Sequence, residues 1–301
     1  MKGTIMRVSV IQMCPGHSKE ANIAQAGQLI AAAAVEKPDI VSLPEMWSCL
    51  GGSRSLKFDE AEELPAFGSG GTGDAAYEFL RATAISLGTV VHGGSIGERG
   101  QGADAGRLFN TTVAFGSDGT ELARYRKIHL FDITTPDGTG YRESSTYGAG
   151  QDVVGYTAGG LPIGCAICYD VRFAELFLAL RDAGAELIFL PSAFTVPTGR
   201  AHWEVLIRAR AIETQSWIAA PATWGEHIDG KGEARATYGH SLICDPWGRV
   251  VAECSDGTGF VSAVIDRAAT AKIRRDMPVL EHRAARTAKL QPRSGSRDRA
   301  A

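Results

Sequence analysis

Three residues whose types suit nucleophilic hydrolysis each follow a run that reads as a buried strand. Cys168 ends the run Leu-Pro-Ile-Gly-Cys-Ala-Ile-Cys, Glu45 follows Ile-Val-Ser-Leu-Pro, and Lys127 follows Ala-Arg-Tyr-Arg. Taken singly, Glu45 and Lys127 would more often form structural ion pairs. Together the three supply a nucleophile, a general base and a cation for an oxyanion. The combination predicts hydrolysis of an amide.

The setting of Cys168 favours a reactive thiol. The run 161–168 predicts a strand, and residues 172–183 predict a helix closed by Gly184. The thiol would lie at the strand end, near a helix N-terminus whose dipole favours thiolate. One alternative is a buried, inert cysteine. Another is pairing with Cys165 as a redox couple or half a zinc site, but strand alternation would place the two thiols on opposite faces.

The elements that must position these residues alternate between strands and helices, with hairpins after residues 115 and 245. This pattern predicts an α/β fold with mixed sheets. Two Gly-rich loops, 51–73 and 132–150, are long enough to be lids or parts of the site. We expect strands at 8–13, 39–44, 89–96, 109–115, 121–126, 161–168, 187–190, 217–221, 238–245, 249–253 and 260–265, and helices at 22–36, 75–87, 172–183 and 202–215.

Length and composition favour one globular domain. The chain has 301 residues, 44% hydrophobic and 22% charged, with a net charge of −3. We expect a single domain over 1–283 and a basic, flexible tail over 284–301 that is solvated rather than a nucleic-acid arm. We expect no nucleic-acid or membrane partner. Six cysteines without a recognisable secretory leader predict free thiols and a cytoplasmic enzyme.

Three motifs in one order resemble the nitrilase superfamily of carbon–nitrogen hydrolases. They are Leu-Pro-Glu at 43–45, Arg-Lys-Ile-His-Leu-Phe-Asp at 126–132 and Ile-Cys-Tyr-Asp-Val-Arg-Phe at 167–173. The runs Pro-Ser-Ala-Phe at 191–194, Arg-Ala-Arg-Ala-Ile-Glu-Thr-Gln at 208–215 and Tyr-Gly-His-Ser at 238–241 resemble its Nit branch, which contains deaminated-glutathione amidases and omega-amidases.

That resemblance implies a four-layer α-β-β-α sandwich and homo-oligomers, dimers or larger, formed by packing of the α-layers. It also implies a triad of Glu45, Lys127 and Cys168, with Glu143 as a second glutamate that would orient Lys127 or position the substrate amide. In such a site Glu45 would take the thiol proton, and Lys127 with the backbone N–H of Tyr169 would hold the oxyanion. The scheme uses no metal and no organic cofactor.

The substrate implied by the resemblance is a primary amide of a small carboxylate-bearing molecule, such as deaminated glutathione or α-ketoglutaramate. Candidate substrate contacts are Arg172, Phe194, Thr195 and His202. Arg172 could equally form a structural ion pair with Asp170 or Glu175. Alternatives of the same superfamily are a nitrilase or an N-carbamoyl amidohydrolase, and a more distant one is a catalytically idle interaction protein. The chain departs from the branch at Arg200 and in its C-terminal ending, which leaves the substrate open.

Overall fold

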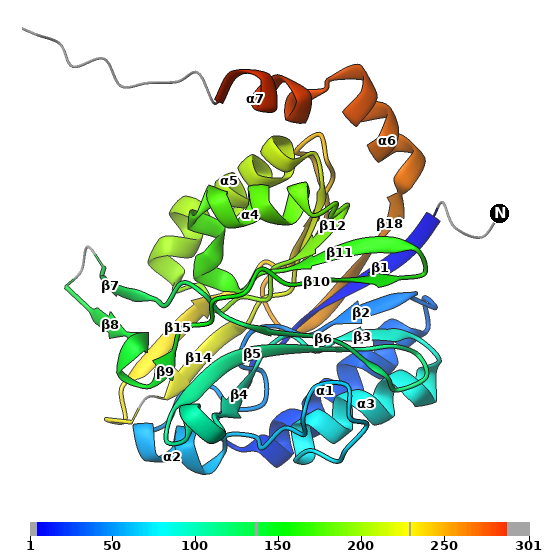
Figure 1. Cartoon of the computed structure of the whole chain (residues 1–301). Coiled ribbons are helices and arrows are strands. Elements are labelled where there is room, and N and C mark those ends of the chain that lie inside the picture. Colours follow the sequence, from blue (N-terminus) through cyan, green and yellow to red (C-terminus); the bar gives the residue numbers. More distant parts are fainter. Residues whose placement is uncertain (1–4, 136–137, 229, 288–301) are drawn as a thin grey trace, which may run out of the picture.

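The computed structural model describes residues 5–135, 138–228 and 230–287 of the chain. Two mixed β-sheets pack face to face, with α1 and α3 covering one outer face and α4 and α5 the other (Figure 1). The expected four-layer α-β-β-α sandwich is confirmed. Among the described residues no helix is both long and apolar enough to cross a membrane.

The first sheet is built mainly from the N-terminal half, with the last strand of the chain at one edge. Its order is β18-β1-β2-β3-β5-β4, and β6 and β9 also pair with β5. All eight residues of β5 are buried, as expected for a strand between two layers. Its strands are β1 Ile5–Gln12, β2 Ile40–Ser42, β3 Val90–His92, β4 Ile96–Arg99, β5 Leu108–Phe115, β6 Glu121–Arg126, β9 Tyr147–Gly148 and β18 Gly259–Asp266.

The helices over the first sheet carry recognisable end signals. Ser18 caps α1 (Lys19–Ala34) by accepting a hydrogen bond from the backbone N–H of Ala21. Gly88 ends α3 (Ala75–Leu87) in the left-handed conformation. The apolar faces of both helices bury one cluster against the sheet, which includes Ile30 and Leu80.

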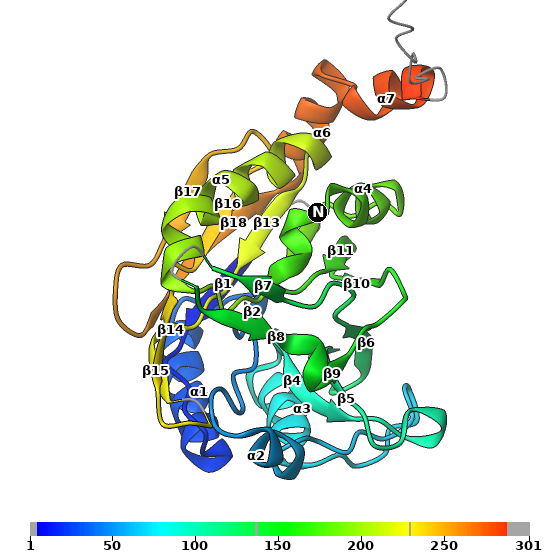
Figure 2. The same cartoon turned by 90° about the vertical axis from the view of Figure 1, so that its left-hand side faces the viewer.

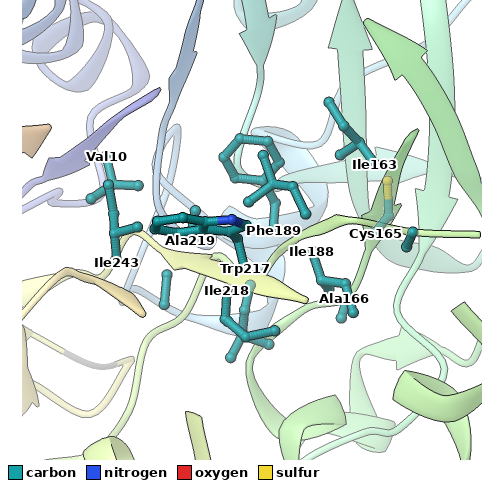
Figure 3. Close-up of a cluster of buried hydrophobic side chains, with 14 of the residues drawn as sticks. Val10, Ile163, Cys165, Ala166, Ile188, Phe189, Trp217, Ile218, Ala219 and Ile243 are labelled. Atoms are coloured by element: carbon teal, nitrogen blue, oxygen red, sulfur yellow. The ribbon is translucent and has the colours of Figure 1, made fainter. Parts of the chain in front are cut away.

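The second sheet has the order β10-β11-β12-β13-β16-β17. Its inward-facing residues form the largest buried cluster together with residues of the first sheet, α4 (Ala174–Asp182) and α5 (Val196–Thr214). Figure 3 shows part of this cluster, including Val10, Ile163 and Phe189. The strands are β10 Gly155–Ala158, β11 Leu161–Cys165, β12 Leu187–Phe189, β13 Trp217–Ala220, β16 Leu242–Cys244 and β17 Val250–Glu253.

Two separate hairpins and a short helix gather at one end of the sandwich (Figure 2). They are β7–β8 (Asp132–Thr134 and Gly140–Arg142), β14–β15 (Trp224–Ile228 and Ala234–Tyr238) and α2 (Arg54–Asp59). The helix and the first hairpin lie within the two loops that were expected to build the site. The hairpin β14–β15 was missed by the sequence analysis, although the Gly-Lys-Gly run at 230–232 between two β-type runs is a turn signal.

Several predicted boundaries are wrong, each for a local reason. The strand expected at 161–168 ends at Cys165, because Cys168–Arg172 turns into a 3-10 helix, and α4 therefore begins at Ala174. The strand expected at 89–96 divides into β3 and β4 at Gly94, which has φ +60°. A Cβ there would lie 2.1 Å from the Pro44 carbonyl oxygen, so only glycine fits beside the segment that leads to Glu45.

Helical structure extends further than expected in two places, before the helix predicted at 202–215 and after the last predicted strand. Helix α5 begins at Val196, since a proline in its first turn is compatible with helix initiation. After β18 the chain continues into α6 (Arg267–Asp276) and α7 (Val279–Thr287). Helix α7 thus continues past the domain boundary expected at residue 283. The rest of the predicted flexible tail, residues 288–301, lies outside the described residues.

Candidate functional site

The four residues proposed for the chemistry line one cavity of about 540 Å³ at the end of the sandwich that carries the hairpins. Glu45 follows β2, Lys127 follows β6, Cys168 begins the 3-10 turn after β11, and Glu143 begins another 3-10 turn (Glu143–Ser145). Strand ends of two packed sheets therefore bring together residues that are far apart in the sequence.

Lys127 is held between the two glutamates. Its Nζ donates to Glu45 Oε1 at 2.8 Å and to Glu143 Oε1 and Oε2 at 3.1 and 2.9 Å. The lysine is only 1% exposed. Burial opposes its charge, but the charges of Glu143 and Glu45 outweigh this and raise the pKa of Lys127 well above its usual range. The ammonium is therefore a permanent cation in the cavity wall.

Cys168 occupies a strained turn that several hydrogen bonds maintain. Its φ is +47°, which is costly for a residue with a side chain. Its N–H donates to the Pro191 carbonyl oxygen at 2.9 Å. Buried Asp170 accepts hydrogen bonds from the Ile167 N–H, the His129 N–H and the Tyr125 hydroxyl. Asp170 thereby joins the turn that carries Cys168 to the segment that carries Lys127.

The expectation of a thiolate favoured by a helix dipole is wrong for the resting protein. Burial and the charge of Glu45 raise the pKa of the Cys168 thiol well above its usual range, and a hydrogen bond to Glu45 adds to this. The charge of Lys127 and a backbone hydrogen bond from Ala193 act in the opposite direction. Helix α4 begins only at Ala174. The raised pKa favours the neutral thiol, so a nucleophilic role for Cys168 would require a base to remove its proton.

Cys165 belongs to the core rather than to the cavity. It is fully buried and lies among Ile163, Ala166 and Phe189, as Figure 3 shows. Burial raises the pKa of its thiol to about 12. The alternation argument used against the Cys165–Cys168 pair does not apply, because β11 ends at Cys165. The pair is nevertheless not formed, since both cysteines are free.

The residues expected to contact substrate divide into two groups. Phe194 and Thr195 line the cavity, as does Tyr169, whose N–H was the expected oxyanion donor. Arg172 and His202 are not among the described residues that line it. The Arg172 guanidinium lies 3.3 Å from His202 Nδ1 and stacks over the rings of Tyr169 and Phe194. Arg172 therefore supports the cavity wall from behind.

Two features of the cavity were not predicted from the sequence. The first is Asn110 of β5, whose side-chain amide contacts both glutamates. The second is a group of basic residues that line the outer cavity, which we call the basic rim. Three of the five come from the loops expected to build the site, and two come from the missed hairpin and its turn. The basic rim consists of Arg54, Lys57, Arg142, Lys231 and Arg235.

Among the described residues no group of three or more His, Cys, Asp and Glu side chains is arranged to hold a metal ion. Glu45 and Glu143 already share Lys127, and His129 pairs through Nδ1 with Asp170 at 2.7 Å. The two carboxylates that line the cavity are thus already paired with Lys127. What the arrangement can do chemically is proton transfer and nucleophilic attack within a largely buried site.

Comparison with known proteins agrees with this chemistry. Residues 7–275 match the carbon–nitrogen hydrolase family. The chain is 37% identical to a deaminated glutathione amidase of Synechocystis, over 91% of this chain and 97% of the relative. It is 40% identical to the human deaminated glutathione amidase, over 92% and 81% of the two chains. It is 36% identical to human omega-amidase NIT2, over 93% and 95%.

Solved structures show the same architecture. The NitFhit protein of C. elegans aligns with a TM-score of 0.82 at 34% identity, covering 97% of this chain and 67% of that one. Nit3 of Saccharomyces cerevisiae, described as a member of branch 10 of the nitrilase superfamily, aligns with a TM-score of 0.80 at 27% identity. That alignment covers 93% of this chain and 97% of Nit3.

Proposed function

This chain belongs to the carbon–nitrogen hydrolase family and is a hydrolase of non-peptide carbon–nitrogen bonds, and from that premise we propose a specific amidase reaction. The substrate is a primary amide of a small carboxylate-bearing molecule, cleaved through a thioester on Cys168. The observation that carries the proposal is the convergence of Cys168, Glu45 and Lys127 on one cavity whose outer part is basic.

In the acylation step the Cys168 sulfur attacks the amide carbonyl carbon while Glu45 removes the thiol proton. The charge of Glu45 acts on the Cys168 thiol and both residues line the same cavity, which supports this assignment. Lys127 and the Tyr169 N–H stabilise the oxyanion, and one such donor contributes ~3–4 kcal/mol to lowering the barrier. Protonated Glu45 then returns its proton to the nitrogen, and ammonia leaves as the thioester forms.

In the deacylation step Glu45 accepts a proton from a water molecule that attacks the thioester carbon. The resulting tetrahedral intermediate expels the sulfur, which recovers a proton from Glu45, and the acid product leaves. Glu143 holds Lys127 in place through two hydrogen bonds. No other reactant enters the cycle besides water.

The basic rim supports a substrate that carries a carboxylate beyond the amide. Its side chains come from α2, β8 and the β14–β15 hairpin, so they face the cavity from different segments. Cationic side chains, arginine above all, are suited to binding carboxylates. The names of the relatives favour deaminated glutathione or a short ω-amide such as α-ketoglutaramate as the substrate.

We also propose a cytoplasmic homo-oligomer. All six cysteines are free, which suits a reducing compartment. Val205 and Ile212 of α5 are exposed apolar side chains on the outer α-layer, which supports pairing of two copies through that layer. Sedimentation equilibrium would show a single monomeric species if this is wrong.

The reaction is tested with a panel of α-ketoglutaramate, deaminated glutathione, a neutral aliphatic amide, a nitrile and an N-carbamoyl amino acid. We expect ammonia release from one of the two carboxylate-bearing amides and a mass increase at Cys168 equal to the acyl group. Cys168→Ala should abolish both. Turnover of the nitrile or the carbamoyl compound alone would contradict the amidase assignment. Absence of any adduct at Cys168 would contradict the thioester mechanism.

A further inference from the structure

Asn110 contacts all three polar residues that surround the nucleophile. Its backbone carbonyl oxygen accepts the Lys127 N–H at 2.8 Å. Its side-chain Nδ2 donates to Glu45 Oε1 at 2.8 Å and to Glu143 Oε1 at 3.2 Å. The residue lies on β5, is 1% exposed and lines the cavity. One strand position therefore connects the expected base, the expected oxyanion cation and the second glutamate.

These contacts close a ring of four hydrogen bonds with alternating donors and acceptors. Glu45 Oε1 and Glu143 Oε1 are the acceptors, and Lys127 Nζ and Asn110 Nδ2 are the donors. Rotating the amide by half a turn would aim Oδ1 at two carboxylate oxygens, so the ring fixes its orientation. Asn110 Oδ1 has no hydrogen-bond partner in the described part of the chain. Donation to the two carboxylates is therefore the principal polar contact of this side chain.

The ring leaves one oxygen of Glu45 for chemistry. Oε1 already accepts hydrogen bonds from Lys127 and Asn110, whereas Oε2 has neither donor. Because Oε1 is held by two donors, the carboxylate cannot rotate freely and Oε2 points in one direction. The orientation of Glu45 is thus set by two donors of different character, one a cation and one a neutral amide.

The neutral donor matters most during the reaction. At rest the contacts of Lys127 Nζ go to three carboxylate oxygens, and an ammonium group has three N–H bonds. To hold an oxyanion Lys127 must weaken one of these contacts. Asn110 does not contact the oxyanion, so its hydrogen bonds to the two glutamates can persist while Lys127 redirects one of its own.

We propose that Asn110 is a positioning residue for the hydrolysis proposed above, on which this inference rests. Its amide fixes the positions of the Glu45 and Glu143 carboxylates, and it aims Glu45 Oε2 at the thiol while Lys127 turns to the oxyanion. Neither glutamate needs to move when the charge develops. Such preorganisation is expected to act on kcat more than on KM, because it stabilises the transition state.

The test uses two substitutions that keep the shape of the side chain. Asn110→Leu removes both N–H donors, and Asn110→Asp replaces the donor with an oxygen. The matched control is Thr111→Val, which removes a buried hydrogen bond to Glu98 from the neighbouring position of the same strand. Thr111 is not among the described residues that line the cavity. Circular dichroism establishes that each variant is folded.

The first readout is the rate of Cys168 alkylation by iodoacetamide as a function of pH, resolved by peptide mass spectrometry. It requires no amide turnover, so it decides about Asn110 even if the proposed substrate is wrong. Because N–H donors favour ionised carboxylates, their loss should move the acidic limb of the profile to higher pH. We expect a shift of about one unit in both variants, the size of one charge-assisted hydrogen bond. Thr111→Val should overlay the wild type.

The second readout is steady-state kinetics on whichever amide the wild type hydrolyses. We expect kcat to fall about 100-fold, the order of a misplaced general base, with KM changed less than about threefold. Alkylation profiles of Asn110→Leu and Asn110→Asp that overlay the control would overturn the proposal. If one variant does not fold, the profile of the other decides by the same criterion.

Discussion

At the scale of single residues, Lys127 shows how the protein keeps a charge away from water. An isolated buried ammonium would be strongly destabilising, and the two glutamates on either side of it offset that cost. The same contacts explain why the cluster is suited to catalysis, since its dipoles and charges are already in place before substrate binds. Both the stability of the fold and the proposed chemistry therefore depend on the contacts of Lys127 Nζ with the Glu45 and Glu143 carboxylates.

Lys127→Gln should therefore destabilise the protein as well as inactivate it. The variant leaves two buried carboxylates without their cation, a change that typically costs about 3–5 kcal/mol of unfolding free energy. Part of the loss should be recovered between pH 7 and pH 5, where the carboxylates can take up protons. Urea unfolding at both pH values measures this. Lys272→Gln, which removes an exposed ion pair with Asp276, should change stability far less. Equal losses of stability in the two variants would contradict the prediction.

At the scale of elements, the contact between the two sheets contains a buried histidine. His92 of β3 stacks on Phe189 of β12 with ring centroids 4.3 Å apart, and its Nδ1 lies 3.2 Å from the Ser42 hydroxyl. Burial lowers the pKa of His92 to about 3. The imidazole is therefore neutral in the folded protein, whereas in the unfolded chain it would take up a proton below about pH 6.5.

Acid should destabilise the sandwich through this residue. Between pH 6.5 and about pH 3 only the unfolded state binds the proton, so the free energy of unfolding decreases as the pH falls. At pH 5 the contribution is about 2 kcal/mol relative to pH 7. Denaturant unfolding of His92→Asn should show a shallower dependence between these pH values than the wild type. His17→Asn, at an exposed position, should keep the wild-type dependence; identical slopes for all three proteins would refute the assignment.

A contact between helix α5 and the β14–β15 hairpin fixes the position of the part of the basic rim that the hairpin carries. Gly199 of α5 lies against Tyr238 at the end of β15, and a Cβ on Gly199 would come within 2.2 Å of the tyrosine ring. Alanine is the better helix former by about 1 kcal/mol, so propensity alone would favour the substitution. The contact should override it, because the ring cannot retreat without moving the hairpin.

Gly199→Ala should therefore displace the hairpin that carries Arg235. We expect a lower melting temperature and a raised KM for a carboxylate-bearing amide, while the rate of Cys168 alkylation stays within about twofold of the wild type. Thermal unfolding and kinetics measure these effects. Gly16→Ala adds a Cβ where no atom lies within 4 Å and serves as the control. A stabilised Gly199→Ala protein with unchanged KM would show that the contact does not matter.

At the scale of the whole molecule, the charge is distributed unevenly. The net charge is −3, yet five basic side chains line the outer cavity. A concentrated positive field inside a weakly acidic protein attracts anions to one place and is screened by salt. We therefore expect several segments together, rather than one anchoring arginine, to select the substrate.

Ionic strength should separate anionic from neutral substrates. Between about 0.05 and 0.5 M salt we expect kcat/KM for a carboxylate-bearing amide to fall about 3- to 10-fold, and that for a neutral amide to change less than about twofold. Arg235→Gln should reduce the salt dependence for the anionic substrate only. Initial rates at several salt concentrations provide the measurement, and an equal salt effect on both substrates would argue against the basic rim.

The sequence alone was sufficient for the fold class and for the assignment to the carbon–nitrogen hydrolases, because the patterns behind both are local. Glu45, Lys127 and Cys168 each lie in a short motif at a strand end, and strand–helix alternation indicates the layers. The helix at 75–87 and the hairpin 109–115/121–126 were predicted closely, since their apolar patterns and turn residues act within a few positions.

Only the tertiary structure decided what surrounds those residues. The neutral state of the Cys168 thiol depends on burial and on Glu45, which lies more than a hundred positions away in the chain. The contacts of Asn110 and the composition of the basic rim arise where β5, α2 and two hairpins meet. A local pattern can show which groups react, but protonation and substrate selection depend on distances between groups that the sequence separates.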